Sequence, residues 1–155
     1  MVCHCARVEG FCAVWTRTGT RYALTMAELD YAFLADFAQV EGGKLSAIGA
    51  SYTHASVDSL DGQWITTIAG RVRTTIDAPS SELAIRIVVP ELYELAYTDE
   101  LKVDQNARPY GDGAVGILFA ATVALPIIAG GLYEVFISID GVECRRLAFD
   151  MSVGQ

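Results

Sequence analysis

The chain has 155 residues, of which 52% are hydrophobic and 19% charged, and its formal net charge is −8. This length fits one domain with one core, and the charged share lies below the roughly 25% that is usual in soluble domains, so much of the chain must be buried. The acidic balance disfavours nucleic acid and anionic lipid headgroups as partners, because their phosphates would be repelled.

Residues 1–25 show neither strand alternation nor a sustained helical stripe. Arg7 and Glu9 precede an apolar run, "GFCAVW", that is shorter than the roughly 7 to 15 residues of a signal-peptide core. The "CHC" at Cys3 lacks a second Cys/His pair at zinc-ligand spacing, so we expect no metal there. We expect residues 1–25 to be an unstructured leader or a mis-assigned start of translation, and residues 26–155 to form the domain.

The first patterned segment, residues 29–40, carries signals for both a helix and a strand. Thr25 and Glu28 match a capping box, and a double glycine follows where a helix could end. Strand alternation is nearly as good, with one face formed by Leu29, Tyr31, Phe33, Ala35 and Phe37. The residues alone leave the two alternatives open, whereas the next segment, "KLSAIGASY", is strand-like.

Turn chemistry interrupts the remaining chain at short, even intervals, and apolar runs of strand length lie between the turns. The turn signals are "EGGK", "LDG", "APSS", "VVPE", "GDG", "AGG" and "IDGV". Three runs alternate and predict half-buried strands. Their inward residues are expected to be Trp64, Thr66, Ile68, Val72 and Thr74; Leu83, Ile85, Ile87 and Val89; and Tyr133, Val135, Ile137 and Ile139. On the first strand the wet face is expected to hold Gln63, Thr67, Arg71 and Arg73.

No charge occurs between Gly113 and Glu134, a stretch long enough to cross a bilayer as a helix. Pro126 and the glycine pair at 130–131 interrupt it, which favours two strands and a loop over one helix. Since Val115–Leu125 shows no alternation, we expect a central strand covered on both faces.

The last strand pair is predicted from its turn. Asp140 and Gly141 suit the two positive-φ positions of a tight hairpin. The return strand keeps its apolar residues on the core face only with a bulge near Arg145–Arg146. By alternation with Val142, Cys144 is expected to be buried and inert.

Two stretches resemble a bacterial family of unknown function, domain-of-unknown-function family 6941. The matching positions near the start are Leu34, Ala35, Asp36, Val40, Gly43, Lys44, Leu45 and Gly49, and those of the closing hairpin are Gly131, Tyr133, Gly141 and Phe149. The resemblance implies a small antiparallel β-sandwich and no particular activity. It therefore favours a strand over 29–40 and an all-β fold: a single antiparallel sandwich, immunoglobulin-like or C2-like, of about eight strands.

Candidates for chemistry are few. Ser51, His54 and Asp58 supply the residue types of a hydrolytic triad, but they lie in one short segment without a nucleophile elbow. Acidic residues on a loop bind calcium through their oxygens, and the candidates here are Asp99, Glu100, Asp104 and Asp112, which lack EF-hand spacing. Aromatic and polar loop residues that could bind a small ligand are Tyr52, His54 and Tyr110.

We therefore expect a soluble, cytoplasmic, non-catalytic protein-interaction module without a cofactor. Its partner would be a protein, because an open sandwich leaves edge strands that can pair with another chain, including a second copy. A small-ligand or carbohydrate-binding domain is the alternative, and a hydrolase centred on His54 comes third.

A truncated chain that starts at Met26 should be as stable as the full chain, because residues 1–25 offer no patterned apolar face to dock. Thermal unfolding of both chains checks this. A melting temperature lowered by several degrees would show that the leader packs on the domain.

Overall fold

The computed structural model describes residues 27–89, 92–111 and 113–154, and over these ranges the chain forms ten strands and no helix. The fold is therefore all-β, as predicted, with ten strands rather than about eight. Three strands form one sheet in the order β1-β5-β8. They are antiparallel neighbours: β1 (Glu28–Ala35), β5 (Gly62–Thr75) and β8 (Ala114–Ile127).

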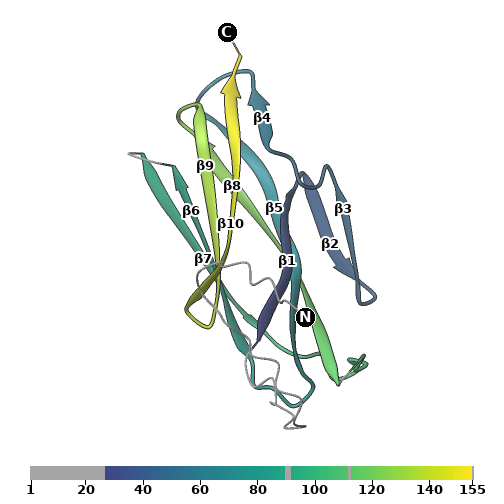
Figure 1. Ribbon diagram of the computed structural model, residues 1–155. Coiled ribbons are helices and arrows are strands. Elements are labelled where there is room, and N and C mark those ends of the chain that lie inside the picture. The colour runs from purple at the N-terminus through teal and green to yellow at the C-terminus, as the bar shows by residue number, and fades with distance from the viewer. Residues whose placement is uncertain (1–26, 90–91, 112, 155) are drawn as a thin grey trace, which may run out of the picture.

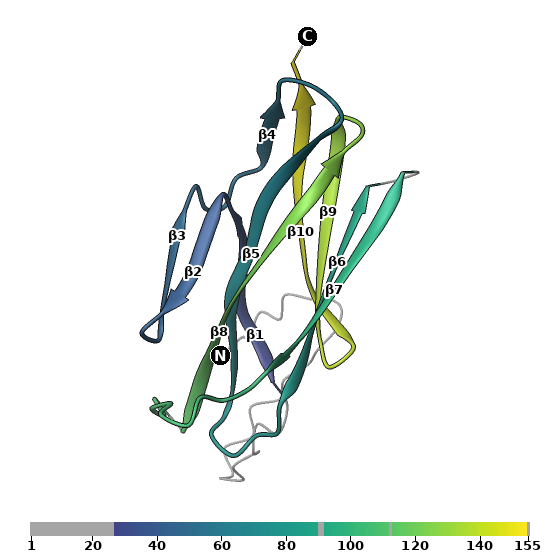
Figure 2. The same cartoon turned by 180° about the vertical axis from the view of Figure 1, so that it is seen from behind.

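A second sheet has five strands in the order β4-β10-β9-β6-β7 (Figure 1). Its strands are β4 (His54–Val57), β6 (Ser81–Val89), β7 (Tyr93–Leu101), β9 (Gly131–Ile139) and β10 (Val142–Val153). The pairing of β4 with β10 is parallel, so the expectation of a wholly antiparallel fold is wrong at this edge. The short strands β2 (Phe37–Glu41) and β3 (Lys44–Ile48) form a separate hairpin. Figure 2 shows this hairpin beside the three-stranded sheet, on the side away from β6 and β7.

The three-stranded and five-stranded sheets share one hydrophobic core. Alternation in β6 and β9 places one parity of each strand in it, as predicted, because successive side chains of a strand point to opposite faces. From the other sheet, Ile68 and Leu125 reach the same core and are fully buried. Tyr133 and Phe149 stack at its centre with their rings 5.2 Å apart.

β1 confirms the strand prediction for the ambiguous segment but divides its apolar residues differently. The register with β5 shifts between Leu29 and Tyr31, so the predicted common face ends there. Ala32 and Leu34 then enter the main core, whereas Phe33 and Ala35 belong to a second cluster with Ala38 of the hairpin. Both faces of β1 are thus used, because the core covers one and the hairpin the other. The fifth residue of the predicted face, Phe37, lies beyond the end of β1 and is exposed.

The long strand β5 follows the predicted alternation with one correction. Thr67, expected on the wet face, is fully buried. Its hydroxyl lies 3.0 Å from that of Thr122 on β8, which satisfies this buried polar group. Arg71 and Arg73 do lie on the outer face, where they pair with Asp30 at 2.7 and 3.7 Å.

The prediction that Val115–Leu125 is a central strand is wrong. Within the described sheets β8 pairs along its length with β5 alone, and is therefore an edge strand. Its alternation is weak because Leu118 and Ala120 on the outer face are also partly covered, next to the β2–β3 hairpin. Pro126, which has no N–H to donate, is tolerated at such an edge.

Turns and bulges follow local chemistry. Asp140 and Gly141 have φ of 49° and 78°, as a tight hairpin requires. The register of β9 with β10 shifts between Glu143 and Arg145, next to the predicted bulge position. Ser51 also takes a positive φ of 62°, and its N–H bonds to the Leu34 carbonyl at 2.7 Å.

The uncharged run that begins at Gly113 forms β8 and the start of β9, as predicted for two strands and a loop. Across the described residues there is no helix with the length and apolar character needed to traverse a bilayer.

Gly70→Ala should destabilise the protein by about 1–3 kcal/mol, because overpacking a filled core costs this much. A Cβ at this position would lie 2.3 Å from the Tyr31 carbonyl oxygen and 2.7 Å from the Phe119 ring. Gly62→Ala, in the same strand, is the control: no atom lies within 4 Å of its Cβ position, and we expect no loss. Urea unfolding measures both, and equal stabilities would contradict the close approach at Gly70.

Candidate functional site

Two of the three predicted ligand-binding residues lie together. Tyr52 and His54 line a shallow hollow of about 550 Å³, with Asp36 and Trp64 also in its wall. Tyr110 lies elsewhere, because its backbone pairs with Ala114 at the opposite end of the β5–β8 ribbon. Of the three ligand-binding residues predicted from the sequence, the structure therefore brings only Tyr52 and His54 together.

Hydrogen bonds inside the protein use the polar ends of the aromatic residues in this hollow. The Trp64 indole N–H donates to the Tyr52 hydroxyl at 3.2 Å, which in turn lies 2.6 Å from the Thr66 hydroxyl. Thr66 donates to the Ala35 carbonyl at 3.2 Å. Tyr52 also packs edge-on against Phe149 of the core, 5.4 Å between ring centroids. These contacts give Tyr52 and Trp64 a structural role that joins the two sheets.

Tyr110 takes part in a cation–π arrangement. The Arg71 guanidinium lies 5.9 Å from the Tyr110 ring and 5.3 Å from the Tyr31 ring, and it also pairs with Asp30. Arg71 is therefore held on three sides, and Tyr110 covers an ion pair rather than facing an open hollow.

The triad candidates are not joined by hydrogen bonds in the described structure. His54 is exposed at the start of β4, and its Nδ1 lies 3.1 Å from the Thr53 hydroxyl. Ser51 and Asp58 are exposed in the loops before and after this strand. A hydrolytic relay needs the base between nucleophile and acid, and none of the described hydrogen bonds supplies that order.

The calcium candidates are spread along β7 and the segment after it. Asp99 accepts hydrogen bonds from the Tyr97 hydroxyl at 3.2 Å and from the Glu100 N–H at 2.8 Å. Asp104 accepts from the Asn106 N–H at 2.6 Å, and Asp112 lies outside the described residues. Within 27–89, 92–111 and 113–154, no group of three His, Cys, Asp or Glu side chains is arranged to hold a metal ion.

Cys144 is exposed, so the prediction that its side chain is buried is wrong. It lies at the bulge between Glu143 and Arg145, where alternation is reset. Its sulfur nevertheless faces the backbone, 3.3 Å from the Ile137 carbonyl oxygen, and burial of the thiol raises its pKa. The thiolate that would react is therefore disfavoured.

A long concave feature runs along the free edge of β8. Two hollows of about 830 and 590 Å³ share four lining residues, and we call them together the β8 edge groove. The shared residues are Val40, Lys102, Ile117 and Leu118. One wall is the β2–β3 hairpin, the other is the end of β7 and the segment 102–108, and β8 residues 116–121 form the floor.

Charge in this groove is unevenly placed. Lys102 pairs with Glu100 at 2.7 Å, and its hydrogen bond, with one from Ser80, holds the pKa of Glu100 below its usual value. Arg108 lines the end next to Gly116 and takes part in none of the ion pairs found among the described residues. The other end is lined by apolar residues of β2, β6, β7 and β8 together with Gln39, Asp99 and Glu100.

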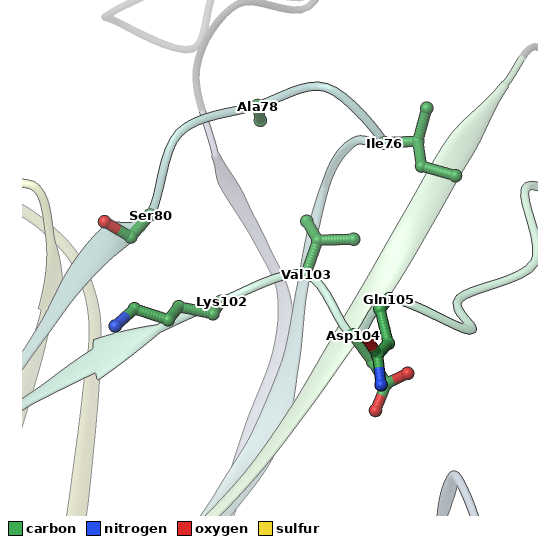
Figure 3. Close-up of a pocket in the computed structure, with 7 residues that line it drawn as sticks. All are labelled: Ile76, Ala78, Ser80, Lys102, Val103, Asp104 and Gln105. Atoms are coloured by element: carbon green, nitrogen blue, oxygen red, sulfur yellow. The ribbon is translucent and has the colours of Figure 1, made fainter.

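A further hollow of about 510 Å³ lies beside this groove, between the β5–β6 loop and residues 102–105 (Figure 3). In Figure 3 Ser80 and Lys102 point to one side, whereas Asp104 and Gln105 point to another. Because its polar side chains diverge, it offers no convergent set for catalysis.

The β8 edge groove was missed by sequence reasoning. Its three parts are separated by tens of residues, and local patterns do not show which strand is at an edge. The available signal was the lost alternation of Val115–Leu125, which we interpreted as burial on both faces.

The structure defines an all-β protein whose main surface feature is a long uncharged strand edge in a groove. The chain belongs to the family of unknown function DUF6941, whose model matches residues 30–152. This confirms the resemblance drawn from the two ends of the domain. No curated protein matches this sequence.

Among solved structures, the chain is similar to the Pseudomonas fluorescens alkylpurine DNA glycosylase AlkC bound to DNA containing an abasic site analog, at 9% identity and a TM-score of 0.46. The match covers 83% of this chain and 31% of the glycosylase, so the chain spans about a third of that protein's length. A similarity at this level carries no argument about function.

Tyr52→Phe should lower the free energy of unfolding by about 1–2 kcal/mol, because the Trp64 N–H loses its acceptor and the Thr66 hydroxyl loses one of its two hydrogen bonds. Tyr97→Phe is the matched control. Its hydroxyl bonds only to exposed Asp99, and we expect a change within about 0.5 kcal/mol. Urea denaturation compares them; equal effects would contradict the structural role of Tyr52.

Proposed function

We propose that this protein is a cytoplasmic β-sandwich of immunoglobulin-like or C2-like type that acts as a non-catalytic protein-interaction module through the free edge of β8. The observation that carries this proposal is the character of that edge. β8 is 14 residues long, contains no charged residue, and keeps an unshifted register with β5 along its described length. An isolated bridge from Tyr110 to Ala114 is the other backbone pairing of β8 among the described residues.

Other edges of the sheets carry the features that prevent pairing. β7 bears Glu94, Asp99 and Glu100, and β1 bears Glu28, Asp30 and a register shift. β4 has only four residues. Charges, bulges and short length are the means by which proteins protect edge strands, and from Ala114 to Leu125 β8 has none of them.

An unprotected edge presents a row of N–H and C=O groups that another strand can bond. A protein supplies such a strand, whereas the net charge of −8 opposes nucleic acid and anionic membranes. The same edge would also serve a homo-oligomer.

A second candidate function rests on the hollow at Tyr52. Aromatic faces beside acidic and imidazole groups are typical of small-ligand or carbohydrate sites, and Tyr52, Trp64, Asp36 and His54 meet in this hollow. The internal hydrogen bonds of Tyr52 and Trp64 make this candidate weaker than the first. A hydrolase centred on His54 comes third.

Affinity purification of the full chain from its native host tests the main proposal. With the unaltered chain, we expect a partner protein to be recovered in amounts above background. Recovery should fall with Ala124→Lys, because this change places a charge at an exposed position of β8. Val142→Lys, at an exposed position of β10, is the control and should recover the partner in normal amounts. Recovery of no protein, or equal recovery by both variants, would contradict an interaction through β8.

A further inference from the structure

We propose that the β8 edge groove binds one extended peptide segment of a partner protein, which pairs with β8 at residues 116–121. This inference rests on the proposed function and makes it specific, since it names the site and the chemical class of the occupant. It goes beyond an exposed edge, because only part of β8 lies in the groove.

The first support is the sequence of residues on the groove floor. Residues 116–121 all line it, although successive side chains of a strand point to opposite faces. A cavity that contacts both parities must run along the strand edge and not over one face. The backbone N–H and C=O groups of that edge therefore face the groove. At about 3.4 Å per residue, the floor is roughly 17 Å long and matches an extended peptide of about six residues.

The walls define the side chains that such a peptide would carry. On the core side the groove is lined by Leu83, Tyr97 and Leu101, and on the hairpin side by Ala38 and Val40. In a paired strand, alternate residues face the two walls. Both walls combine apolar side chains with polar ones, Gln39 on the hairpin side and Glu100 on the other. The segment would therefore carry apolar residues where it faces the apolar parts of each wall.

The positive charge of Arg108 favours an anionic group at one end of the bound peptide. Arg108 lines the same end of the groove as Gly116 and Asp104 and is outside every ion pair found among the described residues, whereas Lys102 is already paired with Glu100. An acidic side chain or a terminal carboxylate at this end of the peptide would complement the guanidinium. The ligand class is therefore a short, apolar, extended segment with an anionic group at one end.

The walls also argue against a second copy as the occupant. β2 and the end of β7 flank the edge of β8 on both sides. Pairing of two β8 strands would bring the hairpin and β7 of each copy towards those of the other, whereas a single extended chain carries no such neighbours. We therefore assign the groove to a peptide.

Selection of a displayed library of random ten-residue peptides on the immobilised full-length protein tests this assignment. We expect enriched apolar segments with an acidic end. In hydrogen exchange, a synthetic copy of the best peptide should slow amides within 116–121 and leave β4 and β10, which do not line the groove, unchanged. N-methylation of its alternate amides should abolish binding, because main-chain hydrogen bonds are lost.

Matched variants separate the groove from other apolar surfaces. Val40→Asp should weaken the affinity for the selected peptide on the order of tenfold or more, because the groove wall gains an unpaired charge. Ile48→Asp is the control on the same hairpin: Ile48 is 68% exposed against 43% for Val40 and does not line the groove. With Arg108→Glu, the library should yield peptides with basic instead of acidic ends. Arg145→Glu, at an exposed position, should leave the selected ends acidic.

The contrary outcomes are distinct from failure of the proposed function. The groove assignment would be overturned if no peptide were enriched, or if the bound peptide protected residues outside the groove and not 116–121. A protein partner that is lost on Ala124→Lys would then still support an interaction module. If the protein formed a concentration-dependent dimer in which the amides of 116–121 were protected without peptide, the occupant of the groove would be a second copy of the chain and not a peptide. Equal weakening by Val40→Asp and Ile48→Asp would also overturn the assignment.

Discussion

The pairing of β5 with β8 over the full 14 residues of each strand is the interaction on which the remaining structure depends. One face of this ribbon closes the main core through Ile68, Phe119 and Leu125. The other face supports the β2–β3 hairpin through a small cluster that includes Ala69. Because β5 is bonded on both sides and β8 on one, the ribbon also determines where the protein remains open to a further strand.

Much of the fold could be predicted because its signals are local. The alternation of Leu83, Ile85 and Ile87 identified β6 without knowledge of its neighbours. Asp140 and Gly141 fixed the last hairpin, and the parity of the apolar residues after it required a bulge. These features depend on the backbone conformation of a few adjacent residues, which sequence patterns report well.

Strand neighbours and the candidate site could not be predicted, because they depend on contacts between distant segments. An uncharged strand such as β8 has the same composition whether a second strand or a hairpin covers it. Thr67 was expected to face solvent, because its hydrogen-bond partner Thr122 lies 55 positions away in the sequence. The groove combines β2, β7 and β8, and no short pattern describes its walls. For the hollow around Tyr52, the sequence indicated which residue types could bind a ligand but not which of them lie together.

The parallel pairing of β4 with β10 has a consequence for synthesis. Ser152 on β10 bonds to the Ala55 carbonyl at a separation of 97 positions. β4 therefore leaves the ribosome long before its partner and stays unpaired while most of the domain is translated. Contacts of such wide separation slow folding, because the loop between them must close before they form. The five-stranded sheet is complete only after translation has reached β10, so β4 cannot take its final place until that strand has been made.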